Sequence, residues 1–276
     1  MMLDLRDAKK HFLDYVAAYA SYDTYKFYEN CINIFIDYID LPFPEINNLN
    51  NNTVTDFIKY LRYHSKVKNV TVRSYIRGLK VFDNYLYENG FKLEPLSNLK
   101  LPKDDRDLKI PLSDQEVKVL VAAIERMPES LIDRNLCIFY LMLDCGLRLQ
   151  EVCNLKVTDV NFIDKLIYVR NSKNNKSRVV PLPEDLAVLL ASYFGSREFQ
   201  SPYMFLMNSG DVITKTAVKN MFRKLKNVVP RVHAHLLRHT FATSYIMGGG
   251  SLEVLRVLLG HSTYNVTQFY KYNNAI

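Results

Sequence analysis

His235-Leu236-Leu237-Arg238-His239 is followed along the chain by Leu259-Gly260-His261 and, nine residues after that last histidine, by Tyr270. A second arginine lies upstream in Cys145-Gly146-Leu147-Arg148-Leu149-Gln150-Glu151. Arginine and histidine side chains near a tyrosine are groups that can hold a phosphodiester while a phenol oxygen attacks it. The C-terminal half is therefore predicted to fold around one phosphoryl-transfer site.

Arg148 and Arg238 are the cations of the predicted site. Negative charge grows on the non-bridging oxygens of a phosphodiester as a nucleophile adds, so preorganised cations aimed at those oxygens give the largest catalytic stabilisation. Arginine suits this task because its planar fork donates two hydrogen bonds and stays charged. Both arginines are expected near a helix start, where the helix N-terminus favours anions. Glu151, one helical turn after Arg148, is placed to support it; taken alone, Arg148 would be assigned to a surface salt bridge.

His235 and His261 are the candidates for proton transfer, since a neutral imidazole can donate to a phosphate or accept the tyrosine proton near neutral pH. His64, His233 and His239 have no such context, and we interpret them as structural.

Tyr270 is the candidate nucleophile among 19 tyrosines. A phenol has a pKa near 10, so a nucleophilic tyrosine needs a neighbouring base and cations. Composition cannot distinguish Tyr270 from the other tyrosines, but its position nine residues after His261 does. Tyr272 and Tyr264 remain competitors.

Lys173 lies in a polar turn between two β-branched runs, Leu166-Ile167-Tyr168-Val169 and Arg178-Val179-Val180, a pattern typical of a β-hairpin. A lysine on such a turn can protonate the departing 5′ oxygen of a cleaved strand. Lys176 is the second candidate for this role. Without the other motifs, Lys173 would be interpreted as a plain backbone contact.

The charge distribution favours a polyanionic partner. Formal net charge is +7, and acidic residues are missing from two lysine- and arginine-rich runs, 57–82 and 212–252. Either run alone could be a solvated helix face; two together favour contact with a phosphate backbone. The expected DNA-binding residues are Arg73, Arg77 and Lys80, which share one face of a predicted helix, together with Lys176 and Arg178.

Composition limits the protein class. With 48% apolar residues the chain can bury substantial cores, and it has no apolar run of about 18 residues and no secretory signal at its first residues. We therefore expect a cytoplasmic protein without a membrane partner. The four cysteines, Cys31, Cys137, Cys145 and Cys153, lack metal-ligand spacing and are expected to be reduced and buried.

The pattern along the chain predicts two domains of a mainly α fold with a small β-sheet. Residues 1–95 show helical periodicity, with Thr53 and Thr71 expected at helix starts. Residues 96–111 contain Pro102 and Pro111 and are expected to form an extended linker. Residues 112–276 begin with a capping box at Ser113 and include the hairpin and the motifs above.

These motifs resemble those of the tyrosine recombinases of the phage-integrase and Xer type. The resemblance covers a T-G-L-R-x-x-E-like box at 145–151, with cysteine in place of the common threonine, H-x-L-R-H at 235–239 and L-G-H at 259–261. It also covers a G-K-G-x-K-x-R hairpin at 172–178, in which both glycines are replaced. The family nucleophile follows the L-G-H histidine by nine residues, which corresponds to Tyr270, and the first lysine of the hairpin corresponds to Lys173. The likeness is specific over about residues 107–276 and weaker before them.

The resemblance implies an N-terminal helical core-binding domain with four helices, SAM-like, and a C-terminal mixed α/β catalytic domain. It implies a reaction without metal, ATP or another cofactor, in which Tyr270 forms a 3′-phosphotyrosine bond and releases a 5′-hydroxyl. The partners would be double-stranded DNA with short inverted-repeat core sites and further copies of the chain, in a tetramer on DNA. The implied catalytic residues are Arg148, Lys173, His235, Arg238, His261 and Tyr270, with Glu151 in support.

Three other functions remain open from the sequence. A relaxing, topoisomerase-like enzyme would use the same chemistry without strand exchange between sites. A catalytically silent DNA-binding protein would keep the fold without the activity. The presence of all six implied catalytic residues argues against this alternative. A helical module for protein partners is disfavoured by the two basic runs.

Overall fold

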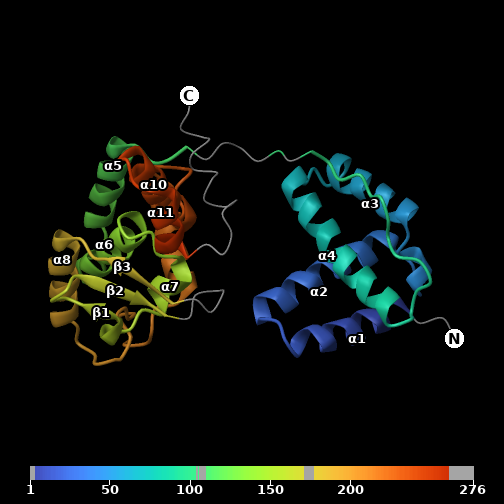
Figure 1. The fold of residues 1–276 in the computed structure, drawn as a ribbon, viewed down its shortest axis with the longest axis horizontal. Helices are drawn as coiled ribbons and strands as arrows, with labels where there is room; N and C mark the ends of the chain where they lie inside the picture. Colours follow the sequence, from blue (N-terminus) through green and yellow to red (C-terminus); the bar gives the residue numbers. More distant parts are fainter. Residues whose placement is uncertain (1–3, 104, 106–109, 171–176, 261–276) are drawn as a thin grey trace. The chain divides into compact units, whose positions relative to one another are not determined.

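The computed structural model describes residues 4–103, 105, 110–170 and 177–260. The chain divides into two compact units, Met1–Asp107 and Leu108–Ile276. Among the described residues the fold is mostly helical with one three-stranded sheet, so the predicted fold class is confirmed (Figure 1). No described helix combines the length and the apolar character that a membrane crossing needs.

The first unit is built from four α-helices and one short 3-10 helix in the described residues: α1 Leu5–Ala17, α2 Tyr22–Ile39, η1 Ile46–Asn48, α3 Asn51–Tyr63 and α4 Asn69–Glu88. Helix α4 packs against α1, α2 and α3. One fully buried phenylalanine from each helix contributes to the common core, namely Phe12, Phe35, Phe57 and Phe82.

Two helices of this unit begin earlier than the sequence predicted. Helix α3 is capped by Asn50, whose Oδ1 accepts from the backbone N–H of Asn52 and Thr53, rather than by Thr53. Helix α4 begins at Asn69 rather than Thr71, because Asp105 accepts from the N–H groups of Asn69 and Val70 at 2.9 and 3.0 Å. A carboxylate at a helix start satisfies donors that have no partner within the helix.

The chain after α4 continues along the first unit. Buried Asp83 accepts from the ammonium of Lys92 and from the N–H of Leu96, which is itself buried. Arg73 donates to the carbonyl of Pro102 at 2.7 Å. The described part of 96–105, which we expected within a linker, therefore belongs to the first unit, because a buried carboxylate and a guanidinium bind it there.

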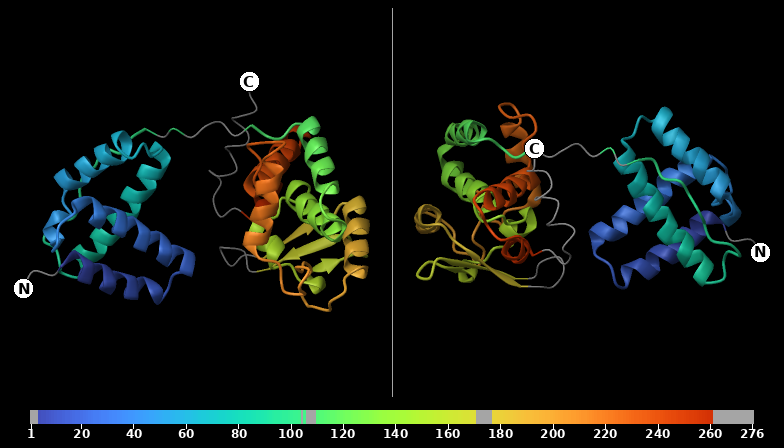
Figure 2. Two further views of the ribbon diagram at one scale, coloured as in Figure 1. Left: turned by 180° about the vertical axis from the view of Figure 1, so that it is seen from behind. Right: turned by 45° about the horizontal axis from the view of Figure 1, so that its top comes forward.

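The second unit contains seven α-helices, one 3-10 helix and three strands in its described part. They are α5 Asp114–Glu125, α6 Glu129–Leu143, α7 Leu149–Cys153, η2 Val157–Asp159, β1 Val160–Asn161, β2 Leu166–Val169, β3 Arg178–Pro181, α8 Glu184–Gly195, α9 Lys215–Leu225, α10 Ala234–Met247 and α11 Leu252–Leu259. The sheet lies at one end of the unit and α5 at the other (Figures 1 and 2).

The sheet has the order β1-β2-β3 with antiparallel pairing throughout. Strands β2 and β3 form the predicted hairpin, with Val169 opposite Arg178; β1 was not predicted. In β3 the buried positions are Arg178 and Val180, so an arginine points into the unit.

Helix α6 packs against α5, α7, α8 and α10 and forms the centre of the second unit, while α11 packs against α10 and β3. This arrangement brings the residues after α6, the start of β3, the first half of α10 and the end of α11 into contact. All four cysteines are free and buried, as expected.

Candidate active site

Arg148 is held at the start of α7 by a tight turn. Gly146 has a φ of +63°, and a Cβ there would lie 2.4 Å from the ring of Phe241, so the turn requires glycine. Arg148 follows as the N-cap residue of α7, and its side chain remains partly exposed. Helix α7 has only five residues. The positive charge at this site therefore comes mainly from Arg148, and not from the helix N-terminus that we expected to assist it.

Glu151 connects the basic residues of the site. Its Oε1 accepts from Nη1 of Arg148 at 2.8 Å and from Nη1 of Arg178 at 2.8 Å. Its Oε2 accepts from the backbone N–H of Arg148 at 2.8 Å and from Nη2 of Arg178 at 2.7 Å. Burial raises the pKa of this carboxyl, but the hydrogen bonds and charges of Arg178 and Arg148 outweigh it and bring the pKa to about 2.

Arg238 lies in α10, and its guanidinium is buried close to the same carboxylate. Its Nη1 donates to the carbonyl of Gly146 at 2.6 Å and lies 4.0 Å from Oε2 of Glu151, and its Nη2 donates to the carbonyl of Leu259. Arg238 thereby joins the turn before α7 to the end of α11.

Helix α11 is followed by its C-cap residue Gly260, the glycine of the Leu-Gly-His motif. Gly260 has a φ of +60°, and its carbonyl accepts from Nη2 of Arg148 at 3.1 Å. A Cβ at this position would lie 3.2 Å from Nη1 of Arg178 and 3.5 Å from Nη1 of Arg148. The motif therefore needs glycine both for its left-handed backbone and for its close approach to two arginines.

Replacing Gly260 with alanine is expected to cost about 1–2 kcal/mol through the left-handed backbone and also to displace the two arginines. Gly249→Ala is the matched control, because Gly249 has a φ of +82° and no atom within 4 Å of its missing Cβ. Thermal unfolding should show a loss in both variants. Only Gly260→Ala should also slow DNA cleavage; equal cleavage by both variants would contradict the close-approach argument.

The low pKa of Glu151 predicts a pH-dependent contribution to stability. A carboxyl whose folded-state pKa lies below its unfolded value of 4.5 stabilises the fold above that value and loses the contribution as pH falls toward about 2. The difference corresponds to about 3 kcal/mol. Urea unfolding of wild type and Glu151→Gln should therefore differ most at neutral pH, with the gap narrowing below pH 4.5. A gap that stays constant down to pH 3 would contradict the prediction.

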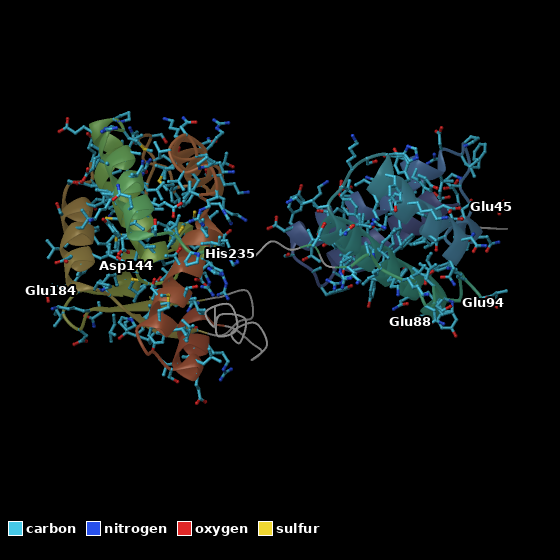
Figure 3. The ribbon with its side chains drawn as sticks, turned by 90° about the horizontal axis from the view of Figure 1, so that it is seen from above. Glu45, Glu88, Glu94, Asp144, Glu184 and His235 are labelled. Atoms are coloured by element: carbon cyan, nitrogen blue, oxygen red, sulfur yellow. The ribbon has the colours of Figure 1, made fainter. Side chains whose placement is uncertain are left out.

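The histidines differ in their environments. His235 is exposed near the start of α10, one turn before Arg238, as its label in Figure 3 shows on that helix. His239 is buried, and its Nδ1 lies 3.4 Å from the hydroxyl of Thr243. His233 is exposed, with Nδ1 2.8 Å from the carbonyl of Arg231. His235 thus combines exposure with a position one helical turn before Arg238.

The expected DNA-binding residues fall into different environments. Arg77 is exposed on α4, Lys80 is half-buried, and Arg73 is bound to the carbonyl of Pro102. Arg178 contradicts the expectation. Its side chain is 3% exposed, and its guanidinium is committed to Glu151, so it does not form part of a DNA-facing surface. The alternation in β3 turns it inward beside Val180.

Several candidates lie outside the described residues. They are Lys173 and Lys176 of the predicted hairpin turn, His261, and the three tyrosines Tyr264, Tyr270 and Tyr272. Among the residues that the structure describes, no cluster of three or more histidine, cysteine, aspartate or glutamate side chains is arranged to hold a metal ion.

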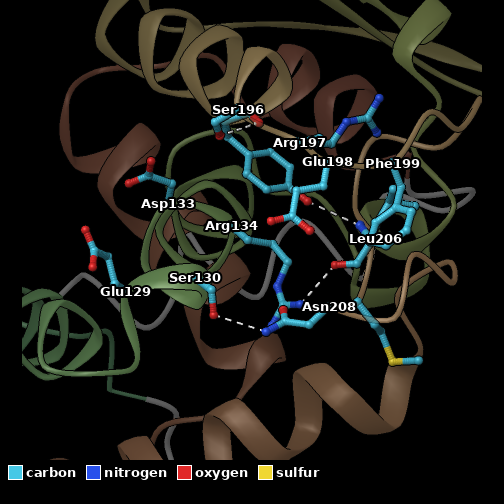
Figure 4. A pocket seen from close by; sticks show the side chains of 12 residues that line it. Glu129, Ser130, Asp133, Arg134, Ser196, Arg197, Glu198, Phe199, Leu206 and Asn208 are labelled. Atoms are coloured by element: carbon cyan, nitrogen blue, oxygen red, sulfur yellow. Dashed lines mark hydrogen bonds between the residues drawn. The ribbon is translucent and has the colours of Figure 1, made fainter.

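A pocket of about 330 Å³ lies elsewhere in the second unit, between the start of α6, the end of α8 and residues 197–208 (Figure 4). Arg134 lines it and donates to the carbonyl of Leu206 at 2.9 Å, so that guanidinium serves to hold the chain. None of the described site residues lines this pocket. The arginine cluster around Glu151 is therefore the better candidate for chemistry.

Comparison with known proteins agrees with the motifs. The model of the phage integrase family matches residues 111–275, and the model of the phage integrase SAM-like domain matches residues 5–98. The chain belongs to the phage integrase family. Because the two models cover both units, this integrase-family chain combines a SAM-like N-terminal domain with a C-terminal catalytic domain.

Curated relatives of this integrase-family chain are tyrosine recombinases. A tyrosine recombinase of Thermosipho africanus is 32% identical over 272 residues, covering 94% of this chain and 92% of the relative. The tyrosine recombinase XerA of Pyrococcus horikoshii is 32% identical over 222 residues, covering 79% of this chain and 75% of the relative.

Solved structures share the fold at lower identity. The Tn1549 transposon integrase in complex with a circular intermediate DNA has a TM-score of 0.81 at 18% identity, covering 98% of this chain and 95% of that one. A lambda integrase dimer bound to a core site has a TM-score of 0.77 at 14% identity, covering 96% and 97%.

Proposed function

We propose that this tyrosine recombinase cleaves and rejoins DNA at specific sites through a 3′-phosphotyrosine intermediate on Tyr270. The Tyr270 oxygen bonds to the scissile phosphorus as the bond to the 5′ oxygen breaks. In the second step a 5′-hydroxyl of the partner strand attacks, and the bond to Tyr270 breaks. The phosphodiester energy is kept in the covalent intermediate, so the cycle needs neither ATP nor another cofactor.

The observation that carries the proposal is the set of arginines around one ionised carboxylate. Arg148 is partly exposed and is oriented by Glu151 and by the carbonyl of Gly260. Arg238 is fixed nearby, between Gly146 and Leu259. Fixed cations of this kind stabilise the charge that grows on the non-bridging oxygens during phosphoryl transfer.

Proton transfer falls to the histidines and to Lys173 in this proposal. His235 or His261 accepts the proton of Tyr270 or donates a hydrogen bond to the phosphate. Lys173 gives a proton to the departing 5′ oxygen. His235 is exposed one helical turn before Arg238, which supports its share of this assignment.

DNA binding is assigned to both units. Arg77 lies exposed on α4 of the first unit, and α9 of the second unit carries exposed Lys219 and Arg223 without any acidic residue. The Tn1549 integrase in complex with a circular intermediate DNA and the lambda integrase bound to a core site share this fold, which supports the assignment. We further propose that four protomers assemble on short inverted-repeat core sites and that the protein acts in the cytoplasm.

Trapping on nicked DNA tests the proposal. Duplexes built on the inverted repeats that flank the gene, nicked next to each candidate phosphate, would be incubated with wild-type protein in EDTA and analysed on a denaturing gel. A covalent protein–DNA band without metal or ATP is expected. Tight binding without any band would favour the silent DNA-binding protein. A band with plasmid relaxation but no joining of two sites would favour the topoisomerase-like enzyme.

A further inference from the structure

Arg178 is bound through all three nitrogens of its guanidinium. Its Nη1 and Nη2 donate to the two carboxylate oxygens of Glu151 at 2.8 and 2.7 Å, and its Nε donates to the carbonyl of Leu258 at 2.6 Å. Such a paired contact fixes the orientation of both partners as well as their distance. With its side chain 3% exposed, Arg178 has no surface to offer to DNA.

Arg178 and the two residues that it contacts, Glu151 and Leu258, belong to segments that carry the predicted chemistry. Glu151 orients Arg148. Leu258 lies in the last turn of α11, directly before the Leu-Gly-His motif. Arg178 itself begins β3, five residues after Lys173 in the sequence. One buried side chain therefore connects three segments: residues 145–151 with Arg148, the start of β3, and the end of α11, which precedes His261 in the sequence.

Charge gives Arg178 a second effect on the site. Within the described residues, the charged groups that face the Glu151 carboxylate are Arg148 from the N-cap of α7, Arg178 from β3 and Arg238 from α10. Arg178 makes the closest paired contact, whereas Arg238 lies at 4.0 Å. Burial works against ionisation of Glu151, so the carboxylate depends on Arg178 to remain the anion that Arg148 needs.

We propose that Arg178 is a positioning residue for strand cleavage, acting through Glu151 and the carbonyl of Leu258 rather than through contact with DNA. The inference rests on the proposed function of the site. It assigns the last residue of the hairpin motif to the interior of the catalytic unit.

The first test compares Arg178→Gln and Arg178→Lys with Arg170→Gln. Arg170 lies at the opposite base of the same hairpin, is 63% exposed and pairs with Asp159, so it is a matched control without contact to Glu151. Single-turnover cleavage by Arg178→Gln should fall about 10²-fold, as expected for a small displacement of catalytic groups. DNA affinity should stay unchanged, and Arg178→Lys should retain part of the rate. Loss of affinity at an unchanged cleavage rate would instead make Arg178 a DNA contact.

A double-mutant cycle separates positioning from general damage to the fold. If Arg178 acts through Glu151, adding Arg178→Gln to Glu151→Gln should reduce cleavage far less than it does in wild type. Fully additive losses would overturn the proposal. The pH profile gives a further readout: in Arg178→Gln, Glu151 should protonate more easily, so cleavage should fall more steeply between pH 8 and pH 5 than in wild type.

Amide hydrogen exchange on the full chain tests the same contacts without DNA. Arg178→Gln and Arg178→Lys should exchange faster than wild type in 149–153 and 252–259, and Arg170→Gln should not. Unchanged exchange in both segments would overturn the proposal. If wild-type protein itself formed no covalent complex while exchange responded as expected, the proposed function would fail and the positioning contacts would stand.

Discussion

Tyr270→Phe is expected to abolish the covalent protein–DNA complex, because phenylalanine has no oxygen that can attack the phosphate. Removal of a nucleophile eliminates the reaction path, whereas removal of a supporting cation lowers the rate by about 10²–10³-fold. The same nicked duplex and denaturing gel provide the measurement. Binding of uncleaved DNA should be retained, since the substitution removes one hydroxyl and no charge.

Tyr272→Phe is the matched control, with the same chemical change two residues further along the chain. It should form the covalent complex at the wild-type level. If the band persisted in Tyr270→Phe and disappeared in Tyr272→Phe, the spacing from His261 would have selected the wrong tyrosine. If the covalent band persisted in both variants, Tyr264 would become the candidate nucleophile.

Glu151→Ala is expected to lower the free energy of unfolding by about 3–5 kcal/mol. The substitution leaves the guanidinium of Arg178 buried without its counter-charge and removes the acceptor for the backbone N–H of Arg148. Removing one partner of a buried pair is costly because the remaining charge stays desolvated. Chemical denaturation of the full chain, with amide exchange followed in β3 and α10, reports the second unit specifically.

Glu184→Ala supplies the comparison for this stability effect. Glu184 pairs with Lys165 at the surface, where both side chains are substantially exposed. A surface pair of this kind contributes about 1 kcal/mol or less. A loss in Glu151→Ala no larger than that in Glu184→Ala would mean that the carboxylate does not hold the arginine cluster together.

The sequence predicted most of the elements because their signals are local. Ser113 and Glu116 form the expected capping box, and the hairpin between β2 and β3 follows from two β-branched runs around a polar turn. The contact between Arg148 and Glu151 spans a single helical turn, which spacing alone indicates. Starts such as that of α4 could not be predicted in the same way, because Asp105, 36 residues away, supplies the cap.

The burial of Arg178, which was expected to bind DNA, could not be predicted for a related reason. Val179 and Val180 are both apolar, so the sequence of β3 does not reveal which alternate positions face the interior. Only packing against α11 and the ionised Glu151 makes the arginine side the buried one. The burial of Arg178 depends on Glu151, a buried acid elsewhere in the chain. The spacing of residues within the hairpin motif does not indicate this partner.

The segment between the two units has a consequence for building hybrid enzymes. Asp105 caps α4 of the first unit, whereas the carbonyl of Ile110 accepts from Arg231 in the second. An exchange of N-terminal domains between relatives should therefore place its crossover after residue 105 and before residue 110. A crossover at residue 96, where the predicted linker begins, would leave α4 without its cap and Arg73 without the Pro102 carbonyl. Chimeras made at that earlier point should express poorly even if their catalytic domains are intact.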